Sequence, residues 1–217
     1  MIDIRVGFCL GRLHRLDESV TRLEDAVRVL EAAGDRAQLA LALDQLGSFL
    51  FLAGRAAEGL AALERSLALA LDLHDARLEL VRIHLGGFLA KAGRADEGKP
   101  HALRGLELAE QMGDWYMAAV AAWMAAEVQD ELGDYDAAAR LRRKELAWLD
   151  RIGGNPHNEA RAHAHLAHLA RLAGDGATQI DEADRARKLA AADPDPGFAA
   201  RIEGALTAER WSEVGEV

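Results

Sequence analysis

The sequence is poor in cysteine, proline and aromatic residues, and each scarcity narrows the class of protein. Cys9 is the only cysteine, so the chain cannot form an internal disulfide, and no cysteine cluster offers ligands for a zinc ion. Four prolines and 5% aromatic residues accompany 50% apolar residues in a chain rich in Ala and Leu, which favours helices. A single thiol fits a reducing compartment, and we expect a cytoplasmic protein.

Long apolar runs and an excess of positive charge are also missing. No run approaches the ~20 apolar residues that a helix needs to cross a membrane. Near the start, Arg5 and Arg12 bracket only six residues, which is too short for a signal peptide. The net charge is −10, which disfavours attraction to a phosphate backbone. We therefore expect no membrane association and no direct nucleic acid binding, and we expect a neutral or basic partner.

Motifs of catalytic sites are absent as well. The sequence has no nucleophile elbow, no Gly-rich phosphate loop between a strand and a helix, and no segment that predicts a strand. Its glycines fall where turns are expected. We predict that the protein is not an enzyme and that it needs no cofactor and no metal.

An internal repeat is the strongest positive signal. Residues 45–59, "QLGSFLFLAGRAAEG", and residues 84–98, "HLGGFLAKAGRADEG", match at ten of fifteen positions. The same pattern recurs near Val6, Ala125 and Leu166, at intervals of 39 to 41 residues. Repeats of this length stack in a line and share no central core.

Each repeat contains two segments with apolar residues at helical spacing. In the second repeat these are Leu39, Leu43, Leu46 and Leu50, followed by Leu60, Leu63, Leu67 and Leu71. Two amphipathic helices are therefore predicted to face each other. A turn glycine such as Gly54 or Gly93 ends the first helix, and Gly47 and Gly86 keep that helix slim where its partner crosses.

These features resemble the tetratricopeptide repeat (TPR) family. The Leu46-Gly47 and Leu85-Gly86 pairs, the turn glycines and the Tyr135 and Ala138 pair carry the resemblance. It implies an all-α fold, a right-handed superhelical solenoid of helix-turn-helix repeats. The predicted repeats span about 1–35, 36–75, 76–114, 115–154 and 155–192, and a capping helix with a short tail follows at 193–217.

The unit departs from the standard repeat in its length, which is near 40 residues against ~34, and it lacks the closing proline. Extended units of this kind are similar to those in the sensor regions of bacterial multidomain transcriptional activators and in kinesin light chains. HEAT and armadillo arrays also have units of ~40 to 47 residues, but the Leu-Gly pair and the turn glycine favour the TPR interpretation.

In such a fold the first helix of each repeat lines a concave surface. Helical spacing then predicts the side chains of a partner-binding groove, with aromatic anchors near its middle. The candidates are Leu41, Asp44, Phe51, Leu80, Ile83, Lys91, Tyr116, Val120, Trp123, Glu127, Asp130, His168 and Arg171. The same spacing also suits packing between repeats, so each residue is either a contact or a core residue. We expect Glu127 and Asp130 to lie on a solvated acidic face.

These patterns favour a protein-protein interaction scaffold that binds a peptide, a helix or a partner domain in its groove. The resemblance suggests the regulatory part of a larger signalling or transcription protein. One alternative is a metal-dependent enzyme that uses the histidines of segment 157–168, of which His165 and His168 share a helix face. A structural or self-assembling role is the other. Separately, Ile2, Ile4, Phe8 and Leu10 are apolar residues at an open end and predict a weak homodimer.

Overall fold

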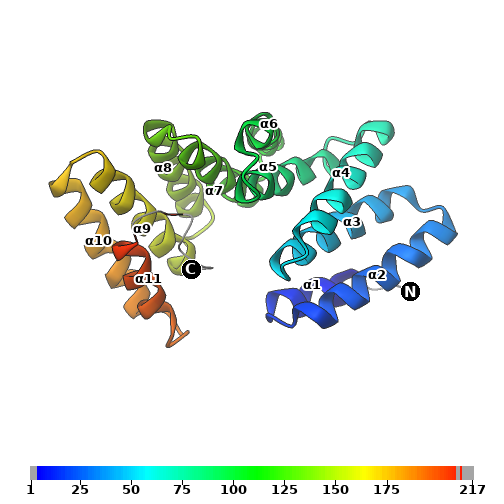
Figure 1. The fold of residues 1–217 in the computed structure, drawn as a ribbon, viewed down its shortest axis with the longest axis horizontal. Helices are drawn as coiled ribbons and strands as arrows, with labels where there is room; N and C mark the ends of the chain where they lie inside the picture. The colour runs from blue at the N-terminus through cyan, green and yellow to red at the C-terminus, as the bar shows by residue number, and fades with distance from the viewer. Residues whose placement is uncertain (1–3, 209–210, 212–217) are drawn as a thin grey trace. The chain divides into compact units, whose positions relative to one another are not determined.

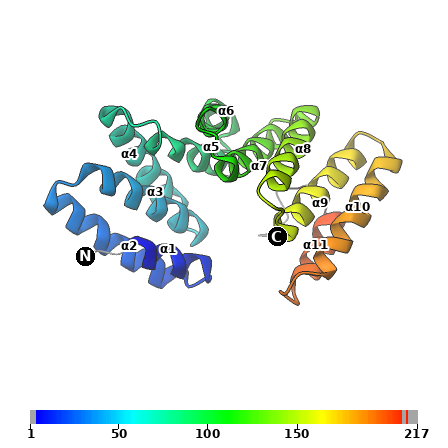
Figure 2. The same cartoon turned by 180° about the vertical axis from the view of Figure 1, so that it is seen from behind.

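The computed structural model describes residues 4–208 and 211, and these residues form helices and no strands. Their contacts divide the chain into two compact units, Met1–Leu108 and Ala109–Val217, and the boundary falls inside helix α6 (Ala95–Met112). Figures 1 and 2 show the helices of each unit from opposite sides. The prediction of an all-α fold is confirmed.

Unit 1 contains helices joined by short turns. They are α1 (Ile4–Arg12), α2 (Leu16–Ala33), α3 (Arg36–Leu52), α4 (Ala56–Leu73), the short 3₁₀ helix η1 (Leu78–Leu80), α5 (Val81–Lys91) and most of α6. Leucines of α2 and α3 form one apolar cluster with Phe49, and leucines of α4 and α5 form another with Phe88. The helix pairs therefore bury the periodic leucines that predict them, except Leu71, which is 46% exposed.

Unit 2 repeats this arrangement in the second half of the chain. Its helices are α7 (Trp115–Glu131), α8 (Tyr135–Arg151), α9 (Pro156–Leu172), α10 (Gly176–Ala191) and α11 (Phe198–Thr207). Phe198 and Ile202 of α11 are fully buried against alanines of α9 and α10. The helix predicted to follow the last repeat thus covers the apolar side of α9 and α10. The division of the chain into five repeats stays a prediction.

Glycine and aspartate set the helix ends. The turn residues Gly54, Gly93, Gly133 and Gly174 all have φ between 72° and 82°, a left-handed conformation that glycine adopts without strain. Asp35, Asp114, Asp134 and Asp175 each accept a hydrogen bond from the backbone N–H three residues later, as N-cap residues do. The turns predicted at the glycines are confirmed.

Gly47 and Gly86 allow close helix packing. A Cβ atom on Gly86 would lie 2.6 Å from the backbone nitrogen of Ala102, and one on Gly47 would lie 2.8 Å from the carbonyl oxygen of Gly59. Both distances are too short for any side chain, so helices α5 and α6, like α3 and α4, touch through their backbones.

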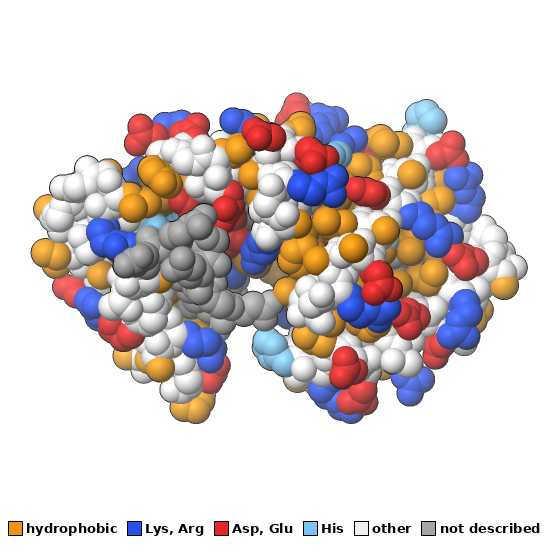
Figure 3. All heavy atoms as spheres, viewed as in Figure 1, with side chains coloured by type: hydrophobic (Ala, Val, Ile, Leu, Met, Phe, Trp, Pro, Cys, Tyr) orange, Lys and Arg blue, Asp and Glu red, His pale blue; other side chains and the backbone are white. Residues whose placement is uncertain are grey.

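Acidic and basic side chains are interspersed on the face shown in Figure 3.

Replacing Gly86 with valine is expected to lower the free energy of unfolding by about 1–3 kcal/mol, because the added atoms must push α6 away from α5. Gly204→Ala is the control, since no atom lies near a Cβ at this helical position. That change should leave stability unchanged or raise it by up to about 1 kcal/mol. Chemical denaturation followed by circular dichroism measures both, and equal effects of the two substitutions would contradict the packing described here.

Candidate functional site

Helix α7 carries the predicted contact residues of the fourth repeat along one face. Tyr116 is 51% exposed, whereas Val120 and Trp123 are partly buried. Further along, the side chains of Glu127 and Asp130 are only 12% and 9% exposed. The end of this face at Tyr116 is therefore accessible to solvent, and the end at Glu127 and Asp130 is mostly buried.

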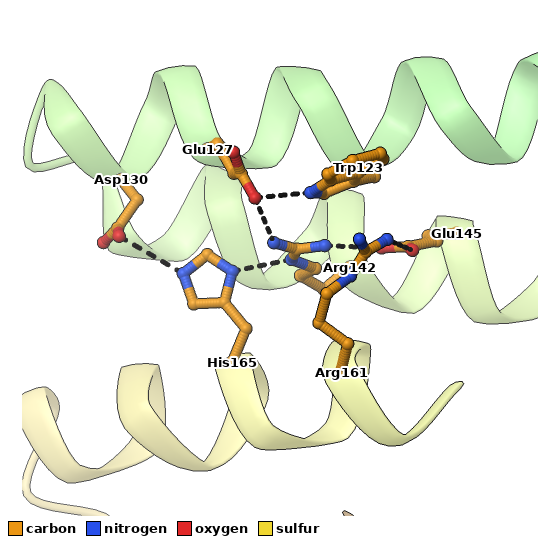
Figure 4. A network of polar contacts seen from close by, with 7 residues as sticks. All are labelled: Trp123, Glu127, Asp130, Arg142, Glu145, Arg161 and His165. Carbon is orange, nitrogen blue, oxygen red and sulfur yellow. Dashed lines mark hydrogen bonds and ion pairs between the residues drawn. The ribbon is translucent and has the colours of Figure 1, made fainter. Parts of the chain in front are cut away.

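The acidic end joins a network of charged and aromatic side chains from three helices (Figure 4). Glu127 accepts a hydrogen bond from the indole N–H of Trp123, and its carboxylate lies 3.3 Å from the guanidinium of Arg142. We call this set the charged network. Its members are Trp123, Glu127 and Asp130 from α7, Arg142 and Glu145 from α8, and Arg161 and His165 from α9.

Arg142 lies at the centre of the charged network and is fully buried. Its Nη1 donates to Glu145 at 2.8 Å, and its Nε donates to Nδ1 of His165 at 2.6 Å. A buried guanidinium is tolerated only where carboxylates and acceptors surround it. Arg142 thus binds α7, α8 and α9 together through charge as well as packing.

The hydrogen bonds of His165 define its protonation state. Since Nδ1 accepts from Arg142, the proton of the neutral ring sits on Nε2, which lies 3.2 Å from a carboxylate oxygen of Asp130. Burial holds the pKa of His165 well below its usual value, and the charge of Arg142 lowers it further. The His165 ring is therefore neutral, and both of its nitrogens make hydrogen bonds in the plane of the ring.

Arg161 fixes the position of Trp123. Its guanidinium carbon lies 3.7 Å from the centre of the indole ring, a cation–π contact, and its Nη2 lies 3.6 Å from Glu145. Burial lowers the pKa of Arg161, although the Glu145 carboxylate opposes this effect. The indole is thus held at its N–H by Glu127 and on its face by Arg161.

These contacts correct two expectations from the sequence. The charge pattern predicts Glu127 and Asp130 on a solvated acidic face, yet both carboxylates are mostly buried and bonded to Arg142 and His165. His168, predicted to line the groove, is only 3% exposed and contacts Arg171 through a ring nitrogen at 3.0 Å. Helical spacing predicts which residues share one face of a helix, but it does not show that other helices cover that face.

Burial of the two histidines predicts that unit 2 loses stability in mild acid. Burial and the charge of Arg171 lower the pKa of His168 to about 4. The unfolded chain takes up this proton near pH 6.5, while the folded chain resists it down to about pH 4. For His168 the contribution is therefore complete above pH 6.5 and is lost as the pH falls toward 4, by about 3 kcal/mol.

Unfolding free energies measured between pH 7 and pH 5 test this expectation. His168→Gln should reduce the pH dependence and leave the part due to His165, whereas His14→Gln, at an exposed position outside unit 2, should keep the wild-type slope. An unchanged slope in His168→Gln would show that His168 is protonated equally in the folded and unfolded states.

In unit 1 the predicted residues differ in exposure. Leu41 and Lys91 are exposed, and Leu80 is partly buried in η1, ahead of the shorter helix α5. Ile83 is fully buried, with its side chain against Gly105, so it is a core residue and the expectation that it lines an open surface is wrong. Asp44 and Phe51 make contacts with α5.

Asp44 and Phe51 of α3 each meet a residue of α5. Asp44 bonds Nδ1 of His84 at 2.8 Å, and Phe51 stacks on Phe88 with ring centres 4.4 Å apart. Burial acts to lower the pKa of His84, but the Asp44 carboxylate outweighs it and the pKa is raised. Both pairs hold α3 against α5, so these residues stabilise the scaffold.

The histidines of segment 157–168 do not converge. His157 pairs with Asp193, His163 pairs with Glu182, and His165 belongs to the charged network. Among the described residues, no group of three or more His, Cys, Asp or Glu side chains could hold a metal ion. The geometry therefore gives no support to the alternative of a metal-dependent enzyme.

Sequence reasoning missed several residues of this site, chiefly Arg142, Glu145 and Trp211. Trp211 is 8% exposed, and its indole stacks on His165 with ring centres 4.2 Å apart. Arg142 lies in the stretch "RLRRKE", where the sequence does not distinguish a buried arginine from the exposed basic residues beside it. Its position is visible only as the fourth residue after Ala138, on the buried side of α8.

Comparison with known proteins is informative at the level of structure. No family model and no curated protein matches the chain. Among solved structures, a Rap protein in complex with competence and sporulation factor matches with a TM-score of 0.80 and 18% identity. This match covers 90% of the chain and 55% of the Rap protein, so the chain spans little more than half the length of that protein.

Two further solved structures match along most of their length. YrrB, described as a TPR protein with an unusual peptide-binding site, has a TM-score of 0.55 and 16% identity, with 93% of this chain and 90% of YrrB covered. A kinesin light chain from Podosopora anserina with nearly identical TPR-like repeats has a TM-score of 0.67 and 12% identity, with 86% and 92% covered. The chain thus has the TPR-like repeat fold, as predicted from its Leu-Gly pairs and turn glycines.

Across the described residues, no helix is both long enough and apolar enough to span a bilayer.

Proposed function

We propose that this protein is a protein-interaction scaffold that binds a peptide or a helix on the surface formed by α7 and α9. The fold supports the class, because TPR-like arrays present the first helix of each pair to partners. One similar structure is a complex with competence and sporulation factor, and another has a peptide-binding site. We further propose that the chain is the regulatory part of a larger cytoplasmic protein of bacteria, a role that its resemblance to the sensor regions of bacterial activators supports.

One observation carries the choice of surface. Tyr116 is half-exposed on α7, and two turns later Trp123 is fixed by Glu127 and Arg161 while part of it remains accessible. Aromatic side chains that are already held in place lose little freedom on binding, so they make effective anchors for a partner.

The charged network also bears on partner chemistry. Glu127 and Asp130 are engaged by Arg142 and His165, so they contribute little charge to a partner's recognition. We therefore propose that apolar anchors, and not ion pairs to these carboxylates, provide most of the affinity. A neutral or basic partner still suits the net charge of −10.

A peptide library displayed on phage tests this function, because it samples many sequences and needs no chosen partner. Peptides selected on the wild-type protein should lose about 30-fold or more in affinity for Tyr116→Ala, as buried aromatic anchors do. The matched control is Tyr135→Ala, because Tyr135 is 42% exposed at the start of α8. Selection of no peptide, or equal losses in the two variants, would contradict the proposal.

Helix α1 of unit 1 carries the apolar residues from which the sequence predicts self-association. On α1, Phe8 is 43% exposed, Ile4 and Leu10 are partly buried, and Ile2 lies outside the described residues. A weak homodimer through this face stays a prediction. Light scattering at high concentration should report an average mass above that of the monomer, and a strict monomer would reject it.

A further inference from the structure

Trp211 lies on a face of the His165 ring. Both ring nitrogens of His165 are bonded in the ring plane, so its faces remain for further contacts. The indole of Trp211 lies on this face, with ring centres 4.2 Å apart and planes only 6° from parallel. Trp211 is 8% exposed.

Two further groups complete the surroundings of Trp211. The His168 ring lies 5.9 Å from the indole, tilted by 51°, and the guanidinium of Arg142 lies 6.0 Å from the indole centre. Three residues earlier, the carbonyl oxygen of Ala208 accepts a hydrogen bond from Arg171. Trp211 thus lies on the neutral ring of His165 and near the cation of Arg142, and Arg171 binds a backbone carbonyl close by. Contacts of these three kinds suit an aromatic residue of a bound peptide.

We propose that this contact site on α9 is a subsite for an aromatic side chain of the partner, and that Trp211 occupies it until the partner displaces it. The inference rests on the proposed function and describes how partner binding at the same site is regulated. The subsite is connected to Trp123 through Glu127 and Arg142, so both aromatic positions belong to one rigid network within unit 2. Trp211 thereby acts as an internal competitor that lowers the apparent affinity for a partner.

The variant Trp211→Ala tests this inference with a defined probe. The probe is a fluorescein-labelled synthetic peptide with the sequence of residues 205–217, "ALTAERWSEVGEV". Fluorescence anisotropy should show that Trp211→Ala binds the peptide at least about tenfold more tightly than the wild type does, because the internal competitor is gone. The same peptide with alanine in place of tryptophan should bind neither protein.

A matched control removes a different stacked tryptophan. Trp115 stacks on Trp148 with ring centres 4.9 Å apart, and neither residue belongs to the charged network. Trp115→Ala should therefore bind the probe no better than the wild type. Equal affinity of wild type and Trp211→Ala, with the variant folded by circular dichroism, would overturn the inference.

Trp211 also packs with Ala160, Ala164, Phe198 and Ile202, so its removal costs some stability. Should Trp211→Ala not fold, hydrogen exchange on the wild-type protein decides the question. Excess probe peptide should then speed the exchange of the Ala208 amide, whose N–H donates to the carbonyl oxygen of Gly204, because displacement of Trp211 releases the Ala208 carbonyl from Arg171 and loosens the last turn of α11. Unchanged exchange at saturating peptide would overturn the inference.

The phage-selected peptides separate failure of this inference from failure of the proposed function. Peptides that depend on Tyr116 but bind wild type and Trp211→Ala equally would leave the proposed function intact. They would show that Trp211 does not compete with the partner. If no peptide that depends on Tyr116 can be selected, the proposed function itself fails.

Discussion

Replacing Arg142 with alanine is expected to lower the free energy of unfolding by about 3–5 kcal/mol, the cost of leaving buried charges without their partner. Arg142 is fully buried and contacts Glu127, Glu145 and His165 from three helices. Without the guanidinium, two carboxylates remain in a poorly solvated interior. Urea denaturation followed by far-ultraviolet circular dichroism measures the loss.

The matched control for Arg142 is Arg140, an exposed arginine on the same helix. Arg140→Ala should change stability by no more than about 0.5 kcal/mol, as is usual for surface positions. If Arg142→Ala were as stable as Arg140→Ala, the charged network would contribute nothing to the fold.

Reversing the charge of Glu127 is expected to be similarly damaging. The Glu127→Lys variant places an ammonium group beside Arg142 and removes the acceptor of the Trp123 indole, at a cost of about 3–5 kcal/mol. Glu131, one turn further along α7, is exposed. Glu131→Lys should therefore alter stability by no more than about 0.5 kcal/mol.

Denaturation of the two reversed-charge variants decides whether the acidic face of α7 is buried or solvated. Equal stability of Glu127→Lys and Glu131→Lys would restore the solvated face that the sequence predicts. A loss confined to Glu127→Lys would support the charged network.

The fold could be predicted because its determinants are local. Helical periodicity of leucines, a glycine that must take positive φ at each turn, and an aspartate at the start of the next helix all act within a few residues. Gly86 adds a packing signal, since only glycine allows the backbone of α6 to approach so closely. The exception is the start of α5, where Asp75 caps a short turn through the N–H groups of Arg77 and Leu78 and η1 precedes the helix.

The site could be predicted only in part because its determinants come from distant helices. Spacing along α7 correctly groups Tyr116, Trp123 and Glu127 on one face. Whether a carboxylate on that face meets water depends on Arg142 and His165, which lie 15 and 38 residues further along the chain. Periodicity within one helix carries no information about such partners.

The signals of all four tryptophan indole N–H groups in a nitrogen–proton correlation spectrum test the central claim most directly. A selected peptide added to the nitrogen-15-labelled protein should shift the signals of Trp123, which donates to Glu127, and of Trp211, which lies on His165. The signals of Trp115 and Trp148, which stack on each other outside the charged network, should stay in place. Movement of Trp115 and Trp148 with Trp123 and Trp211 unchanged would contradict the assignment of partner binding to the surface of α7 and α9.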